Sequence, residues 1–164
     1  MSNTTVTSGI RAALKAAGFN ARQVTVKDRS YGDIKITVRD VSVSLSTVKA
    51  IGDSFRNVRI CEGSGEILCG GNTYVEARYD DSILDPVRAA ISAIISSSEP
   101  GVTVKLAGGF TATRYADSPW RDEVRAHGPG LDNLIAIGID HASEQIAAKY
   151  LDARAVAASG KAAA

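Results

Sequence analysis

Apolar and polar residues alternate over two neighbouring stretches near the start of the sequence. Valine recurs at every second position within residues 23–29, and isoleucine or valine does so within residues 33–38. A period of two is that of a β-strand with one buried face, and residues 30–32 supply turn chemistry between the stretches. The pattern predicts a β-hairpin.

Apolar residues recur at helical spacing in three segments of the first hundred residues. Serine, threonine or aspartate precedes each segment, and these residues accept hydrogen bonds from the first amides of a helix. The expected helices are 7–17 with Thr7 or Ser8 as cap, 44–55 with Ser44 or Ser46 as cap, and 85–97 with Asp85 as cap and Pro86 in the first turn.

The last third of the chain reads as a strand pair followed by two helices. Alternation within residues 102–106 and 110–115, on either side of a Gly-Gly pair, predicts two strands. Ser118 and Pro119 offer the start of a short helix. A Gly-Pro-Gly break at residues 128–130 separates it from a long terminal helix, which is expected from residue 131 to about residue 157.

The glycine-rich stretch at residues 62–81 admits two interpretations. Residues 73–79 alternate as a strand does, and the Gly-Gly-Asn at 70–72 is typical of a turn with positive φ, so a second hairpin with residues 66–69 is the simpler one. The other is a loop that cradles an anion. A phosphate loop opens a helix, whereas this one leads into a strand, so the stretch favours turns.

These elements indicate the α+β class. The 164 residues fit one domain, expected over residues 1–158, in which antiparallel β-hairpins pack against three to five helices including a long C-terminal one; residues 159–164 are expected to fray. No apolar run approaches the roughly 18 to 20 residues that cross a bilayer, so no membrane association and a cytoplasmic location are expected. Cys61 and Cys69 fit reduced thiols, with a disulfide as the alternative.

Charge is distributed unevenly along the chain. Residues 1–60 carry ten Lys/Arg and four Asp/Glu, a net charge of +6, whereas residues 61–164 carry nine and fourteen, a net charge of −5. Basic residues on or beside the first two strands keep a solvent-facing sheet soluble, and they also attract phosphate. The candidate binding residues there are Arg22, Lys27, Arg29, Lys35 and Arg39, with Tyr31 as an aromatic that could stack on a base or on a partner side chain.

Two further clusters carry candidate chemistry. Trp120 and Arg121 begin a charged segment that resembles a short amphipathic helix, and this residue pair is enriched at interface hot spots; packing of the tryptophan in the core is the alternative. His141 and Glu144, beside Asp140, share a helical face that offers two metal ligands, or simply a solvated surface. Neither cluster completes a catalytic or metal constellation, so no catalytic residue, metal or cofactor is assigned.

Residues 10–82 carry a family resemblance. The stretches ALKAAGFNARQVTVKDRSYGDIKITVRD, KAIGDSFRN and GEILCGGNTYVEARYD resemble the large polyvalent protein-associated domains of phages and conjugative plasmids. The resemblance implies an accessory protein of a mobile genetic element, with an anti-defence role such as an anti-CRISPR or anti-restriction factor and a host or mobile-element protein complex as its partner.

Three functions therefore stand side by side. The first is a non-enzymatic protein that acts by protein–protein binding, and the second is a sequence-independent nucleic-acid binder that uses the basic N-terminal sheet face. An enzyme is the third, because glycine loops and scattered Asp, Glu and His supply the parts of a site without its arrangement.

Overall fold

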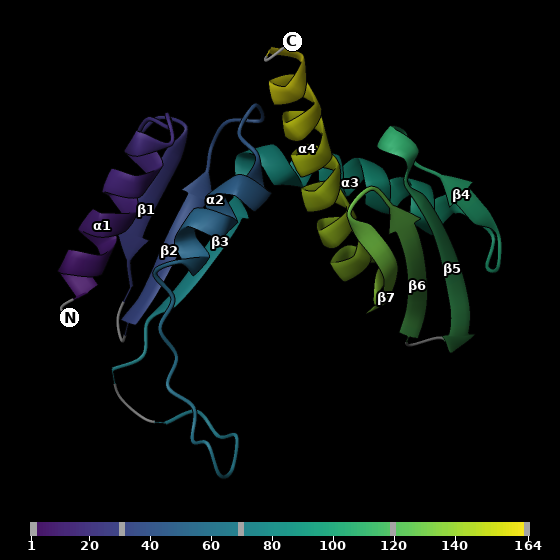
Figure 1. Cartoon of the computed structure of the whole chain (residues 1–164). Helices are drawn as coiled ribbons and strands as arrows, with labels where there is room; N and C mark the ends of the chain where they lie inside the picture. Colours follow the sequence, from purple (N-terminus) through teal and green to yellow (C-terminus); the bar gives the residue numbers. More distant parts are fainter. Residues whose placement is uncertain (1–2, 30–31, 69–70, 119–120, 163–164) are drawn as a thin grey trace. The chain divides into compact units, whose positions relative to one another are not determined.

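The computed structural model describes residues 3–29, 32–68, 71–118 and 121–162, with side chains for all but a few of them (Figure 1). Within this part of the chain, residues 1–80 and 81–164 delimit two compact units. Each unit has its own sheet and its own helices. The single domain expected over residues 1–158 stays a prediction.

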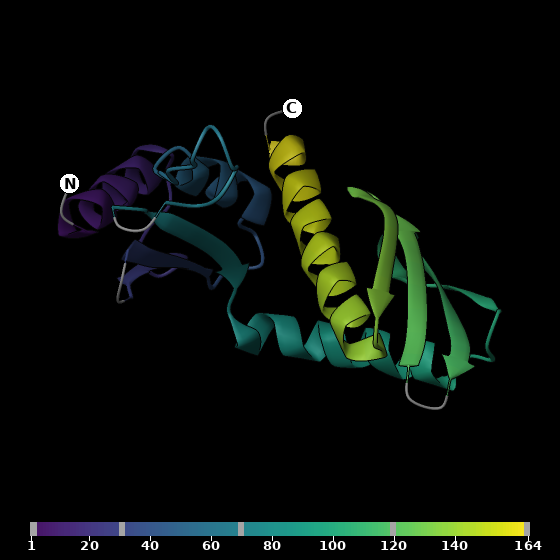
Figure 2. The same cartoon turned by 90° about the horizontal axis from the view of Figure 1, so that it is seen from below.

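The first unit is a three-stranded sheet with two helices on one of its faces (Figure 2). Strand order is β1-β2-β3, with β1 antiparallel and β3 parallel to the central β2. The elements are α1 (Asn3–Ala16), β1 (Val24–Asp28), β2 (Asp33–Val38), α2 (Leu45–Asp53) and β3 (Tyr74–Tyr79). The predicted hairpin of residues 23–38 is confirmed.

The helices cover the face to which the alternating apolar residues point. Ile34, Ile36 and Val38 of β2 are fully buried, and they alternate with half-buried polar residues on the opposite face. Ser44 caps α2 by accepting a hydrogen bond from the Thr47 amide, as its position before the apolar run predicts.

The second hairpin predicted at residues 66–79 is wrong in its pairing. Residues 74–79 do form β3, but β3 pairs with β2, because it completes the face that α2 covers. Residues 66–68 instead belong to an irregular segment with isolated bridges at Asn57–Thr73 and Ile60–Ile67. Asn72 holds this segment, since its side chain accepts from the Arg59 amide and donates to the Leu68 carbonyl. Gly70 and Cys69 lie outside the described residues.

The second unit is a four-stranded antiparallel meander packed against two helices (Figures 1 and 2). Strand order is β4-β5-β6-β7, and α4 packs on β6, β7 and α3. The elements are α3 (Asp81–Ser97), β4 (Thr103–Lys105), the 3-10 turn η2 (Ala107–Gly109), β5 (Thr111–Ser118), β6 (Arg121–Gly128), β7 (Leu131–Ile137) and α4 (Ile139–Ala162). The predicted β4–β5 pair is confirmed.

The short helix predicted from Ser118 and the early start of the terminal helix are both wrong. Residues 121–128 form β6, because the buried Val124 and Ala126 alternate with the exposed Arg125 and His127, which is a period of two. The 128–130 break is the tight connection of a β6–β7 hairpin, with Gly130 at a φ of 66° after a proline. The long helix therefore begins at Ile139.

Two N-terminal helix boundaries also differ from expectation. α1 begins at Asn3, so Thr7 is buried within the helix and does not cap it. α3 begins at Asp81, four residues before the predicted cap Asp85, so Pro86 lies in its second turn. Threonine and aspartate are typical cap residues, but they also occur inside helices. Their position therefore did not fix the helix start, and each helix begins several residues earlier.

Over the described residues, four α-helices and two sheets, one of them wholly antiparallel, confirm the predicted α+β class. The long C-terminal helix is confirmed as the 24-residue α4, which continues through residues 159–162.

Candidate binding surfaces

Four of the five predicted basic residues of the first unit lie on the sheet face that α1 and α2 leave uncovered. Lys27 and Lys35 stand directly opposite each other in the β1–β2 register. Arg29 and Arg39 extend the same alternation beyond the strand ends. Four of the five predicted cations thus share one face, and Arg22 lies apart from them, in the turn before β1.

Carboxylates on this face neutralise much of its charge. Arg29 pairs with Asp33 at 3.7 Å, and Arg39 pairs with Asp80 at 3.5 Å. Lys35 also stands beside Glu76 of β3 in the parallel register. The face is therefore of mixed charge, with the Lys27–Lys35 pair at its centre.

The aromatic candidates fall in the undescribed parts of the chain. Tyr31 and Trp120 lie outside the described residues, and so does the side chain of Arg121. The backbone of Arg121 opens β6, so it does not belong to an amphipathic helix as the sequence predicts.

A groove that the sequence does not reveal runs between α1 and β1. It encloses about 560 Å³, within the range of about 300 to 1,000 Å³ that is usual for ligand sites. Its walls are apolar with a cationic rim, and they are formed by Arg11, Leu14, Lys15, Phe19, Asn20, Ala21, Val24, Thr25 and Val26. None of these lining residues is acidic. Sequence reasoning placed Leu14 on the apolar side of a helix and Val24 and Val26 on the apolar face of a strand, and it singled out neither Arg11 nor Lys15.

The groove borders an edge strand. β1 pairs only with β2 in the described sheet, so its second edge is open to the groove. One side chain covers part of that edge: Nη2 of Arg11 donates to the carbonyl oxygen of Val26 at 2.8 Å.

A smaller groove of about 320 Å³ lies at the opposite edge of the same sheet, between α2 and β3. Its lining carries both signs of charge, with Lys49 and Arg56 beside Asp53 and Glu76. It offers no preference for a cationic or an anionic ligand.

The open face of the second sheet combines apolar and charged residues. Ile135 and Ile137 of the edge strand β7 are 62% and 61% exposed. Beside them in the register, Arg125 pairs with Glu123 at 2.6 Å and lies 4.9 Å from the ring centre of Tyr115. The contacts with Glu123 and Tyr115 account for the placement of the Arg125 guanidinium.

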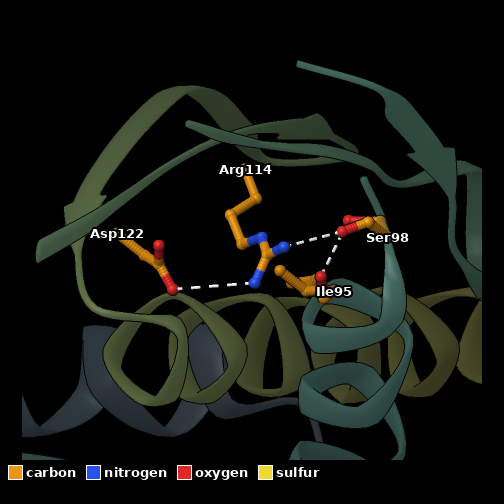
Figure 3. Close-up of polar contacts among 4 residues, drawn as sticks. All are labelled: Ile95, Ser98, Arg114 and Asp122. Carbon is orange, nitrogen blue, oxygen red and sulfur yellow. Dashed lines mark hydrogen bonds and ion pairs between the residues drawn. The ribbon is translucent and has the colours of Figure 1, made fainter. Parts of the chain in front are cut away.

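Arg114 joins α3 to the second sheet, as Figure 3 shows. Its Nη2 donates to the carbonyl of Ser98, just beyond the end of α3, at 2.8 Å, and its Nη1 lies 3.8 Å from a carboxylate oxygen of Asp122. The Ser98 hydroxyl in turn donates to the carbonyl of Ile95. A cation at a helix C-terminus satisfies carbonyls that lack an intrahelical partner, so this contact is structural.

The remaining chemical candidates stay dispersed. His141 hydrogen-bonds to Gln145 at 2.8 Å, and Asp140 accepts from the Ser92 hydroxyl. Among the described residues no three His, Cys, Asp or Glu side chains gather as metal ligands would. Hydrogen bonds from the Ser64 side chain, and then from the Ser64 and Gly63 amides, lower the pKa of the half-buried Cys61 thiol below its ordinary value.

No helix in the described part of the chain is long and apolar enough to span a membrane. Comparison of the chain with protein-family models, with curated proteins and with solved structures gave no match. The surfaces themselves therefore carry the functional argument.

Proposed function

We propose that this chain is a non-enzymatic binding protein that acts by protein–protein contact through the groove between α1 and β1. The observation that carries the proposal is the juxtaposition of an apolar groove with an open strand edge. Apolar walls supply the free energy of burial, and an edge supplies backbone donors and acceptors for a partner chain.

The biological setting is part of the same proposal. The resemblance of residues 10–82 to domains of phages and conjugative plasmids supports an accessory protein of a mobile element, acting in the cytoplasm on a host or mobile-element protein complex. An anti-defence role would need only that the chain occupy a surface of that complex.

A variant that fills the groove tests the protein-binding proposal. Ala21 is an exposed lining residue, so Ala21→Trp should obstruct the groove and leave the core unchanged. Ala12→Trp places the same side chain on an exposed position of α1 outside the groove and is the matched control. The tagged full chain and both variants are used to capture proteins from a bacterial host.

A protein retained by the unchanged chain and by Ala12→Trp, and lost with Ala21→Trp, would support the proposal. Equal retention by all three would place binding elsewhere and refute the role of the groove. Retention of no protein by any of them would refute protein binding as the function.

The Lys27–Lys35 pair supports a second candidate, the binding of nucleic acid by the open sheet face. Like charges directly opposite each other destabilise a sheet. A phosphate backbone would supply anions to both lysines, in addition to Glu76 beside Lys35. We expect Lys27→Glu to abolish binding of the chain to labelled duplex or single-stranded DNA at low salt, and Lys49→Glu to leave it unchanged. Absence of binding by the unchanged chain at low salt would refute this candidate.

A further inference from the structure

The backbone of β1 presents hydrogen-bonding groups to the groove at alternate residues. The Arg39 amide donates to the Gln23 carbonyl and the Arg29 amide to the Asp33 carbonyl, so the odd-numbered residues of β1 bond to β2. In an antiparallel pair the intervening residues then point their N–H and C=O groups the other way. Val24 and Val26 therefore direct their backbone groups away from β2. The Val24 amide donates to the Asn20 carbonyl at 3.0 Å, so among the described residues the Val24 carbonyl and the Val26 amide remain at the open edge.

Arg11 occupies the Val26 carbonyl, which an added strand would need. Its guanidinium lies on an exposed side chain and bonds the Val26 carbonyl, which an added strand would bond through a backbone N–H. Cations at a sheet edge prevent unspecific pairing. A strand that displaces the guanidinium must offer it a new acceptor, and a carboxylate is the strongest available.

The rim of the groove favours acidic residues for a second reason. Arg11 and Lys15 line the groove, and none of its lining residues carries a carboxylate. Lys27 lies on the face of β1 that the helices leave uncovered. The apolar wall of the groove lies on the side of β1 that faces α1, where Leu14 and Phe19 stand next to β1. A strand added to β1 would thus place one set of alternate side chains against apolar residues and the other set near Lys27.

We propose that the ligand of the groove is an extended segment of a partner protein in which apolar and acidic residues alternate, and that it adds to β1 as a fourth strand. The inference rests on the proposed protein-binding function and names the chemistry of the partner. β1 has five residues, so a segment of about five residues, roughly 17 Å long, would span it.

Synthetic peptides test the inference on the full chain. The probe is a fluorescein-labelled peptide of four Val-Glu repeats, and its binding is followed by fluorescence anisotropy. Three matched peptides are compared with it: four Val-Lys repeats, and two Val-Glu peptides in which one or the other set of alternate backbone amides is methylated so that it cannot donate. We expect the Val-Lys peptide to bind about tenfold more weakly or worse. We expect only the methylated peptide whose blocked amides would face β1 to lose binding.

Charge reversal on the protein provides the complementary test. Arg11→Glu should shift the preference from the Val-Glu to the Val-Lys peptide, whereas Lys49→Glu, the same kind of change outside this groove, should leave it unchanged. Hydrogen exchange at the Val26 amide should slow when the Val-Glu peptide binds.

Several outcomes would overturn the inference. Equal binding of the methylated peptides would refute strand addition, and equal binding of Val-Lys would refute the acidic preference. Binding of a small apolar dye in place of every peptide would make the groove a small-molecule site. If no peptide binds but Ala21→Trp still abolishes protein capture, the inference fails while the proposed function stands; if neither effect is seen, both fail.

Discussion

Replacing Arg114 by methionine should destabilise the second unit far more than the loss of an ordinary surface charge. Methionine keeps much of the aliphatic length of arginine and removes the guanidinium that joins α3 to the sheet (Figure 3). The Ser98 carbonyl then loses its charged donor, and Asp122 loses its cation.

The structure sets the size of this effect. A hydrogen bond from a charged group contributes about 1.5 to 3 kcal/mol, and the bond to Ser98 is short and half-buried. The pair with Asp122 is longer, and its side chains are 19% and 29% exposed, so it adds at most about 1 kcal/mol. Nε of Arg114 is buried without a hydrogen-bond partner among the described residues, so its removal costs nothing. We expect a loss of about 1.5 to 4 kcal/mol in the free energy of unfolding.

This loss is measured by urea titration of the second unit within the full chain. Unfolding is monitored by hydrogen exchange and mass spectrometry of peptides from β5 and β6. The matched control is Arg88→Met, which breaks an exposed i,i+3 pair with Asp85 at 3.1 Å and should cost less than about 0.5 kcal/mol. A loss at Arg114 no larger than that at Arg88 would refute the assignment of the contact as structural.

Three further predictions concern the first unit. Gly32 has a φ of 83° and a Cβ there would strike the backbone carbonyl of Asn72, so Gly32→Ala should lower the free energy of unfolding by more than about 1 kcal/mol in urea titrations; an unchanged midpoint would contradict this. Ser44→Ala should cost about 1 kcal/mol by loss of the α2 cap, and Ser44→Asp should restore most of it in the same assay. Hydrogen bonds from the Ser42 amide, the Ser42 hydroxyl and a nearby glutamine lower the pKa of Asp40. The stabilising effect of the Asp40 carboxylate is therefore present above the pKa of an unfolded aspartate, about 3.9, and is lost as the pH falls through the lower folded pKa. The difference in stability between the unchanged chain and Asp40→Asn should shrink over that pH range, and a constant difference would contradict these hydrogen bonds as the cause.

Strands and caps could be predicted from the sequence where one local signal dominates. Alternation alone located β1 and β2, and Ser44 before an apolar run located the start of α2. Pairing could not be predicted in the same way. Residues 74–79 alternate equally well beside residues 66–69 or beside β2, and burial against α2 decides between them.

The region after residue 118 shows how one pattern fits two structures. Leu131, Leu134 and Ile135 stand at i, i+3 and i+4, which is typical of a helix, yet they lie in β7, where Ile135 is largely exposed. An apolar residue that points to solvent on a strand cannot be distinguished by spacing from one that points to the core on a helix. The groove was missed for a related reason, because Leu14 and Val24 read as ordinary core residues and only the fold shows that an open edge lies beside them.

The parallel pairing of β2 and β3 imposes an order of events during synthesis. Residues 39–73 separate the two strands, whereas β1 and β2 are joined by a short turn. At about 5 to 20 residues per second, the ribosome takes roughly 2 to 7 seconds to make the intervening segment. During this interval the edge of β2 that later pairs with β3 stays unpaired, and an unpaired strand edge is a template for pairing with another chain.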